Sequence, residues 1–208
     1  MNENVDFNNP IEKEQNIGST NEVHLLKMMP QVFQYPEILI FTNQNNVYKI
    51  HNQNNHHRGA QVLAEVNYEP DEKPIYMAGT RHYKGFLFFG YANGKLAKIS
   101  LEAYQTETLR KKLKGAYNTE SPLLFIELSE TDLDLIFISN LQKIVLINTS
   151  LINAVGSRNS KGVHVMKSKH QSYVTAIKKP NQVQFTDLEY YRKDLNVVGF
   201  YLKPEDKI

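Results

Sequence analysis

The chain has 208 residues, of which 41% are hydrophobic, and a formal net charge of +2. That length is enough for one or two small domains with a core of their own. The absence of cysteine excludes a disulfide framework and a cysteine-ligated metal site, and it fits a reducing cytosol. No apolar stretch is long enough to span a membrane and the first residues are polar, so we expect a cytoplasmic globular protein without a signal peptide.

Residues 1–22 form an acidic segment, with five acidic residues and one lysine among several asparagines. Such a polar stretch cannot bury enough apolar surface to offset the entropy lost on ordering. We therefore expect residues 1–22 to be a disordered or linker-like segment. The folded repeats are expected to span 23–180, with 181–208 as a C-terminal segment that packs on them.

A sequence repeat of about 48 residues follows the acidic segment. Three segments align: FTNQNNVYKI at 41–50, GYANGKLAKI at 90–99 and ISNLQKIVLI at 138–147. Their offsets are 49 and then 48 residues, and a short apolar run precedes each copy. Each copy therefore predicts a β-hairpin, in which a tight turn joins an apolar strand to a second strand.

The three predicted turns differ in how well their residues suit a tight turn. Asn93-Gly94 is a favoured pair for a turn that needs positive φ. Asn45 takes the place of Gly94 in the first copy, and asparagine tolerates the left-handed region better than most residues. Gln142 takes that place in the third copy, where we expect a strained or differently shaped turn.

A basic residue followed by glycine recurs after each hairpin. The pairs are Arg58-Gly59, Lys114-Gly115 and Lys161-Gly162, and the strand-like segments 60–66, 116–128 and 163–169 follow them. Four short strands in about 48 residues is the spacing of a propeller blade. We predict an all-β fold of three four-stranded, propeller-like blades. Its ring should stay incomplete, because a closed propeller needs more blades.

The remaining elements are short. Residues 101–113 and 187–194 are expected to form one or two helical turns each. Residues 197–202 (VVGFYL) should add a strand that covers an exposed blade edge.

Acidic residues are absent between Asp134 and Asp187, and the basic residues of that stretch are Lys143, Arg158, Lys161, Lys167, Lys169, Lys178 and Lys179. Charges of one sign at this density repel one another unless salt or a polyanion neutralises them. A solvated basic face without a partner is the simpler interpretation, and a polyanion-binding face is the alternative.

Other chemistry finds little support in the sequence. The seven histidines lack the spacing of metal ligands, and no Walker-type loop, nucleophile elbow or HExxH motif is present. Tyr190-Tyr191 lies beside Arg192-Lys193, but without an acidic metal-binding site we expect these tyrosines to serve packing. We therefore expect no cofactor, no metal and no catalytic residue.

Three segments carry a resemblance to a known family: FTNQNNVYKI at 41–50, FGYANGKLAKISLEAY at 89–104 and GSRNSKGVHVMK at 156–167. Together they are similar to the C-terminal domain of the A subunits of DNA gyrase and topoisomerase IV, bacterial type IIA DNA topoisomerases. The resemblance implies a pinwheel of four-stranded blades whose basic rim binds, bends and wraps duplex DNA without reading sequence. It also implies the catalytic region of the A subunit and the ATPase B subunit as partners, and a nucleoid-associated place in the cytoplasm.

Two features depart from the family pattern. The catalytic region with its DNA-cleaving tyrosine is not recognisable, so the chain is expected to take part in an ATP-dependent topoisomerase without cleaving DNA itself. The glutamine-led, glycine-rich basic box of gyrase is also missing, and His56-His57-Arg58-Gly59 is at best a remnant of it. With only three copies of the repeat, this favours a topoisomerase IV-like or degenerate member.

The candidate DNA-binding residues are basic and lie in loops at equivalent positions of the repeat. Equivalent loops of successive blades share one edge, so we expect one continuous basic row that contacts phosphates. The candidates are Arg58 in the first copy, Arg110, Lys111, Lys112 and Lys114 in the next loop, and Arg158, Lys161, Lys167 and Lys169 one repeat later. Lys203 and Lys207 have acids close by and should matter little.

Two further interpretations stay open. The basic edge could dock an acidic protein partner, or the chain could be a degenerate remnant with no independent role. A steep loss of affinity with salt is expected for nucleic acid and partly separates the first of these from DNA binding.

Overall fold

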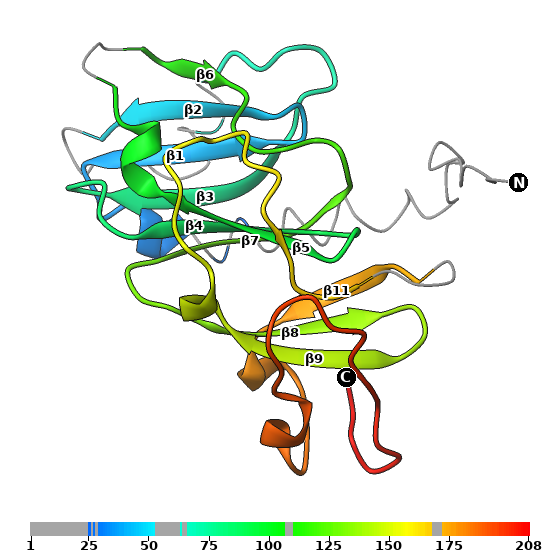
Figure 1. Ribbon diagram of the computed structural model, residues 1–208. Coiled ribbons are helices and arrows are strands. Elements are labelled where there is room, and N and C mark those ends of the chain that lie inside the picture. Colours follow the sequence, from blue (N-terminus) through cyan, green and yellow to red (C-terminus); the bar gives the residue numbers. More distant parts are fainter. Residues whose placement is uncertain are drawn as a thin grey trace, which may run out of the picture.

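A computed structural model describes residues 25, 27, 29–52, 63, 66–106, 110–167 and 172–208. The described strands form three four-stranded antiparallel sheets, which we name the first, second and third blades (Figure 1). The strand order of the first blade is β3 (Pro74–Thr80), β1 (Glu37–Thr42), β2 (Asn46–His51) and β6 (Lys112–Lys114). The order of the second blade is β7 (Leu123–Ser129), β4 (Phe86–Tyr91), β5 (Lys95–Ser100) and β10 (Val163–His164). The order of the third blade is β11 (Val174–Lys178), β8 (Asp134–Ser139), β9 (Lys143–Asn148) and β12 (Phe200–Tyr201). The predicted all-β fold of three blades is confirmed.

The central pair of each blade is the predicted hairpin: β1 with β2, β4 with β5, and β8 with β9. The equivalent turn residues Asn45, Gly94 and Gln142 all have positive φ, at 59°, 77° and 54°. In each turn the backbone N–H of this residue donates to the carbonyl three residues earlier, over 3.0–3.2 Å.

The third turn therefore has the same shape as the other two, and a differently shaped turn is ruled out. Its left-handed glutamine costs roughly 1–2 kcal/mol. Hydrogen bonds from neighbouring segments hold it in place: Leu202 N–H donates to the Gln142 carbonyl over 2.9 Å, and Asn140 N–H donates to the Tyr173 carbonyl over 2.9 Å.

Each hairpin gains one strand on either side. β3, β7 and β11 pair with the first strand of the hairpin, and β6, β10 and β12 pair with the second. The chain makes the hairpin of the next blade before it returns with β6 or β10 to complete the previous one. Neighbouring blades are therefore interlocked.

The strand that follows the first hairpin differs in position from the prediction. It is β3, at Pro74–Thr80, rather than residues 60–66. Most of 60–66 lies outside the described residues, and Leu63 within it is helical. The Glu69–Glu72 turn, in which Glu72 N–H donates to the Glu69 carbonyl over 3.0 Å, leads into β3 instead.

The hydrophobic core consists of layers between the blades. Alternate residues of each strand point to opposite faces of its sheet, so one strand serves two layers. Phe89 of β4 packs with Phe41 of the first blade, with ring centroids 5.9 Å apart. Its neighbour Phe88 faces the other way and packs with Phe137 and Val145 of the third blade.

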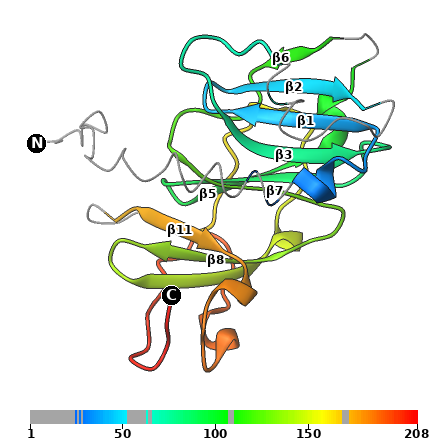
Figure 2. The ribbon, with the colours of Figure 1, turned by 180° about the vertical axis from the view of Figure 1, so that it is seen from behind.

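The two terminal faces of the stack are covered by segments of the same chain, which leaves the ring incomplete. On the first blade, Met29 and Val32 of the helical residues 29–32 pack on Ile38 and Met77. On the third blade, residues 183–202 pack on the opposite face of β8 and β9. Figure 2 shows the helical residues beside β1 and β3, and the C-terminal segment beyond β8.

The short elements agree with the expectations from the sequence. β12, at Phe200–Tyr201, pairs with β9 and confirms the added strand predicted within residues 197–202. Single 3-10 turns form at Leu101–Tyr104 and Leu188–Tyr191, within the two ranges expected to be helical, and others form at Thr149–Leu151 and Pro180–Gln182.

Candidate nucleic-acid interface

The candidate site lies along β6, β10 and β12, the last strand of each blade, which we name the outer edge. β3, β7 and β11 turn toward the middle of the stack instead (Figure 1). A hydrogen bond of 2.7 Å from Leu128 N–H of β7 to the Tyr76 hydroxyl of β3 joins two of these inner strands. The outer edge is thus the side of each blade that lies away from the middle of the stack.

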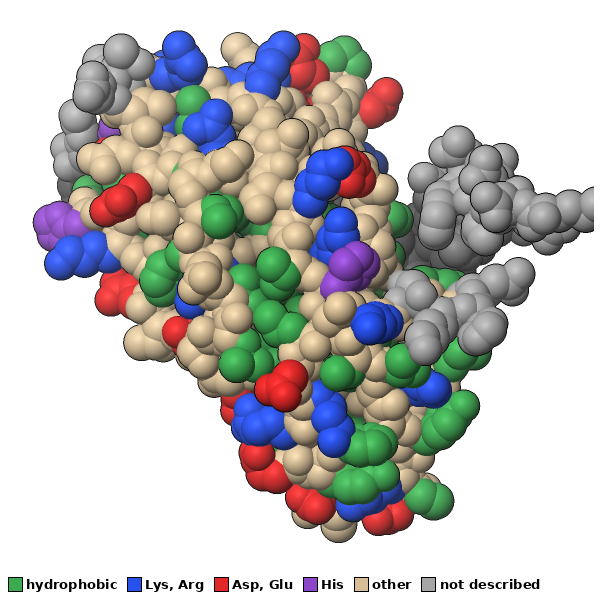
Figure 3. Space-filling model, viewed as in Figure 1, with side chains coloured by type: hydrophobic (Ala, Val, Ile, Leu, Met, Phe, Trp, Pro, Cys, Tyr) green, Lys and Arg blue, Asp and Glu red, His purple; other side chains and the backbone are tan. Residues whose placement is uncertain are grey.

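The 110–114 loop supplies the exposed cations of the first blade. Arg110, Lys111 and Lys114 are exposed, and none of them forms an ion pair with another described residue. Lys and Arg side chains gather over the part of the surface where β6 lies (Figure 3). These three side chains are exposed to solvent, and their contact with phosphate stays a prediction.

The side chain of Lys112 binds other residues of the first blade, in contrast to its exposed neighbours. Its Nζ lies 2.9 Å from Glu69 Oε1, 3.6 Å from Glu72 Oε2 and 5.0 Å from the centre of the Tyr48 ring. The hydrogen bond with Tyr48 and the two carboxylates raise the pKa of Lys112 above its usual value, although partial burial opposes them. Lys112 thus ties β6 to the first blade and is poorly placed to bind phosphate.

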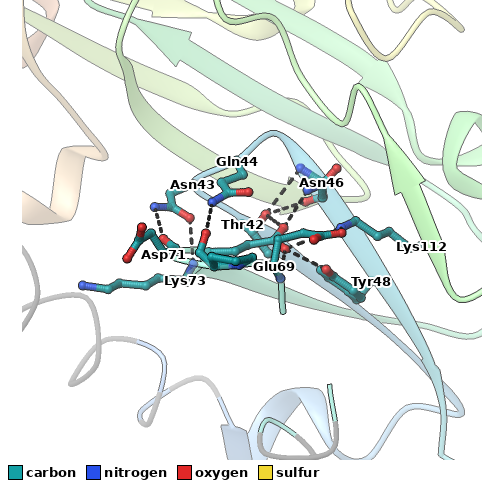
Figure 4. A network of polar contacts seen from close by, with 11 residues as sticks. Thr42, Asn43, Gln44, Asn46, Tyr48, Glu69, Asp71, Lys73 and Lys112 are labelled. Atoms are coloured by element: carbon teal, nitrogen blue, oxygen red, sulfur yellow. Dashed lines mark hydrogen bonds and ion pairs between the residues drawn. The ribbon is translucent and has the colours of Figure 1, made fainter. Parts of the chain in front are cut away.

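Glu72 is the centre of this network. Figure 4 labels Thr42, Asn46, Tyr48 and Lys112, which belong to it. Its buried carboxylate accepts hydrogen bonds from Thr42 Oγ1 at 2.5 Å, Asn46 Nδ2 at 2.7 Å and Tyr48 OH at 2.7 Å. Burial alone would raise the pKa of Glu72, but these bonds and one from Glu69 N–H outweigh it and lower the pKa to about 2. The charged carboxylate therefore organises the start of β2 and the register of β6.

An open pocket of about 580 Å³ lies next to this network. Asn46, Glu69, Lys112 and Lys114 are among the residues that line it. Because the pocket contains an acid as well as two lysines, its charge is mixed.

The 156–162 loop differs from the 110–114 loop. Arg158 Nη1 donates to the Ala103 carbonyl over 2.8 Å, and the guanidinium lies 6.0 Å from the centre of the Tyr104 ring. Lys161 is exposed but forms an ion pair with Glu120. Both candidates are therefore engaged with the protein, which sequence spacing could not indicate.

The two loops nevertheless adjoin, as a continuous row requires. Asn118, four residues after Lys114, places its Nδ2 3.4 Å from the Asn159 carbonyl, and the Lys161–Glu120 ion pair lies beside this contact. Lys167 follows β10 and is exposed. Arg58 and Lys169 lie outside the described residues.

Comparisons with known proteins find similarity at the level of structure alone. No protein-family model and no curated protein matches the sequence. A crystal structure of the C-terminal domain of DNA topoisomerase IV superposes with a TM-score of 0.61 and 16% identity, over 82% of this chain and 61% of that chain. The C-terminal domain of DNA gyrase A gives 0.52 and 13%, over 79% and 59%, and that of E. coli ParC gives 0.59 and 9%, over 82% and 78%.

The chain has the β-pinwheel fold of these topoisomerase domains. The resemblance predicted from the sequence is thereby confirmed at the level of fold. The chain spans about three fifths of the first two domains, in keeping with its three blades.

The pinwheel also places two half-buried lysines beside the outer edge that the sequence-based candidates omit. Lys95 and Lys143 begin the second strand of their hairpins, at the position that Asn46 occupies in the first blade. Lys95 lies opposite His164 of β10, and Lys143 opposite Tyr201 of β12. Partial burial and the charge of Lys95 lower the pKa of His164. Alignment of the three hairpins alone could have found both lysines.

A second basic loop of the pinwheel lies away from the outer edge. Arg81, His82 and Lys84 are exposed in the connection from β3 to β4. They follow Thr80 of β3, which pairs with Glu37 at the start of β1. The hairpin turn lies at the opposite end of β1, after Thr42. This loop offers a comparison, charge for charge, with the outer edge.

Two further findings concern the described residues as a whole. None of their helices is long and apolar enough to cross a membrane. Within the same residues, no three His, Cys, Asp or Glu side chains come together in a way that could hold a metal ion.

Proposed function

We propose that this chain binds duplex DNA along its outer edge, without preference for sequence, and bends it in support of a type IIA DNA topoisomerase. The observation that carries the proposal is the run of cations along the outer edge and beside it. Arg110, Lys111, Lys114 and Lys167 are exposed. Lys95 and Lys143 are half-buried and lie beside the outer edge, opposite His164 of β10 and Tyr201 of β12. The similar domains belong to DNA gyrase and DNA topoisomerase IV, which supports DNA as the ligand.

Lysine and arginine side chains on a strand edge favour the phosphate backbone over the bases. Each phosphate contact releases condensed counterions, so affinity falls steeply with salt. Contacts to phosphate carry no sequence information by themselves. Binding should therefore be strong at low salt and similar for unrelated sequences.

Bending follows from the arrangement of the cations on three blades. In Figure 1, β6 and β9 lie at opposite ends of the stack with β3 and β11 between them, and β12 pairs with β9. The outer strands of the first and third blades therefore face different directions. A duplex that touches all three blades must bend, at a cost of a few kcal/mol by elastic estimates. Several phosphate contacts made together can offset that cost.

The partners proposed with this function are the catalytic region of the A subunit and the ATPase B subunit of the topoisomerase. We place the chain with DNA in the cytoplasm. The fold shared with C-terminal domains of such enzymes supports this setting.

The experiment is fluorescence anisotropy with two duplexes of unrelated sequence, titrated at several salt concentrations. We expect equal affinities for the two duplexes and a linear fall of log affinity with log salt. Energy transfer between dyes on the duplex ends should rise on binding if the DNA bends. Affinity that is indifferent to salt, or a strong preference for one sequence, would contradict the proposal.

A further inference from the structure

Tyr201 is the most exposed large hydrophobic side chain among the described residues. Its exposed fraction is 67%, whereas the other large hydrophobic side chains on the surface reach 37–47%. Burial of a ring of this size against a ligand is favourable. The exposure of Tyr201 makes it a candidate contact for a ligand of the outer edge.

The position of Tyr201 on the outer edge indicates what that ligand is. It lies opposite Lys143 in the pairing of β12 with β9. The equivalent positions are Lys114 opposite Asn46 in the first blade and His164 opposite Lys95 in the second. A tyrosine thus stands in the third blade where the first two carry a lysine and a histidine.

The structure holds the Tyr201 ring outward. Phe200 and Leu202, on either side of it, pack on the apolar cluster that covers the third blade. Because strand residues alternate between faces, the inward position of these two directs Tyr201 away from the cluster. Lys143 Nζ lies over the Tyr201 ring, 4.8 Å from its centre, so a cation occupies one face of the ring.

We propose that Tyr201 stacks on an unstacked base of the DNA bound along the outer edge, while Lys143 contacts a neighbouring phosphate. This inference rests on the proposed function. Aromatic rings on which bases stack, next to cations that follow the backbone, are the usual means of binding exposed bases. In an intact duplex the bases cover one another, so the contact favours DNA with a base already exposed at the third blade.

The stacking contact should show itself in the comparison of two DNA molecules: a short intact duplex and the same duplex with a single-stranded gap at its centre. The parent chain is expected to bind the gapped duplex more tightly than the intact one. Tyr201→Ala should remove that preference and weaken binding to the gapped duplex by roughly 5- to 150-fold, the range for loss of one base–aromatic stack. The slope of log affinity against log salt should not change, because no charge is lost.

Three further variants separate the effect of the aromatic ring at position 201 from the effects of charge and of surface exposure. Tyr201→Phe should keep the preference for the gap. Tyr201→Lys should steepen the salt slope by about 0.9 through a new phosphate contact but lose the preference. Tyr173→Ala is the matched control, since Tyr173 is 41% exposed but lies beside β11, an inner strand.

The outcomes distinguish this inference from the proposed function. A parent chain that binds both DNA molecules equally well, or a Tyr201→Ala variant that keeps the preference, overturns the stacking contact and leaves duplex binding intact. Loss of the preference in Tyr173→Ala as well as in Tyr201→Ala also overturns it. A parent chain that binds neither DNA overturns both proposals.

Discussion

The 110–114 loop and the 156–162 loop have similar basic sequences but differ in how free their charges are. In the first, Arg110, Lys111 and Lys114 meet solvent. In the second, Arg158 binds a backbone carbonyl and Lys161 pairs with Glu120. Local sequence reveals how many charges a loop carries, whereas distant parts of the chain decide how many of them remain available to a ligand.

The largest difference between the loops should be seen in DNA binding. Replacing Arg110, Lys111 and Lys114 together by alanine should lower the slope of log affinity against log salt by about 2.7, at roughly 0.9 for each contact. The fold should persist, since exposed substitutions usually cost within about 0.5 kcal/mol each. The measurement is anisotropy at several salt concentrations. The control is Arg81→Ala with Lys84→Ala, and an equal loss of slope per charge there would contradict the outer-edge assignment.

Arg158 should instead affect stability. Arg158→Ala removes a charged hydrogen bond to the Ala103 carbonyl, so we expect the free energy of unfolding to fall by roughly 1–3 kcal/mol. Urea denaturation measures this, and Arg158→Lys, which keeps the charge but not the planar fork, should recover only part of it. If Arg158→Ala left stability unchanged but lowered the salt slope by about 0.9, Arg158 would be a phosphate ligand.

The network of Glu72 and Lys112 can be tested by measuring how the stability of the fold depends on pH. The pKa of Glu72 is lowered from 4.5 to about 2 in the folded state, so its ionised form stabilises the fold above about pH 4.5. That contribution should be lost as the pH falls from 4.5 toward 2. Denaturation midpoints measured across this range should fall more steeply in the parent than in Glu72→Gln. Parallel curves would show that Glu72 does not hold the network.

The smallest expected effect comes from a substitution that frees a charge in the 156–162 loop, so that this loop becomes more like the 110–114 loop. Glu120→Gln releases Lys161 from its ion pair, so the salt slope should steepen by up to about 0.9. Stability should change little, because exposed ion pairs contribute about 0–1 kcal/mol. Glu130→Gln, an exposed acid that forms no ion pair with the described residues, is the control of equal charge. Equal steepening in both variants would indicate a general charge effect only.

Local residues predicted the hairpins well. Asn93-Gly94 and its counterparts specify a turn within a few residues, and the apolar runs on either side specify its strands. The strand after the first hairpin was misplaced, because which distant segment pairs with β1 depends on long-range contacts. The partners of Lys112 lie about 40 residues earlier in the chain, at Glu69 and Glu72, and no local pattern indicates them.

The candidate site was predictable only in part, because local sequence indicates which residues lie in loops but not which distant residues bind them. Arg110, Lys111, Lys114 and Lys167 are exposed as expected from their loops. Lys95 and Lys143 were visible in the aligned hairpins but were omitted. The exposure of Tyr201 could not be read from its sequence, since it follows from Phe200 and Leu202 taking the inward positions.

The return of β6 and β10 to the preceding blade has a consequence for the order in which the protein can fold during synthesis. The first hairpin ends at His51, but the strand that completes its sheet begins only at Lys112, after the hairpin of the second blade has been made. The second blade likewise waits for Val163, beyond the hairpin of the third. The first two sheets therefore leave the ribosome with an open edge that closes one blade later, so a nascent chain that stalls between blades carries an unpaired strand able to pair with the wrong partner.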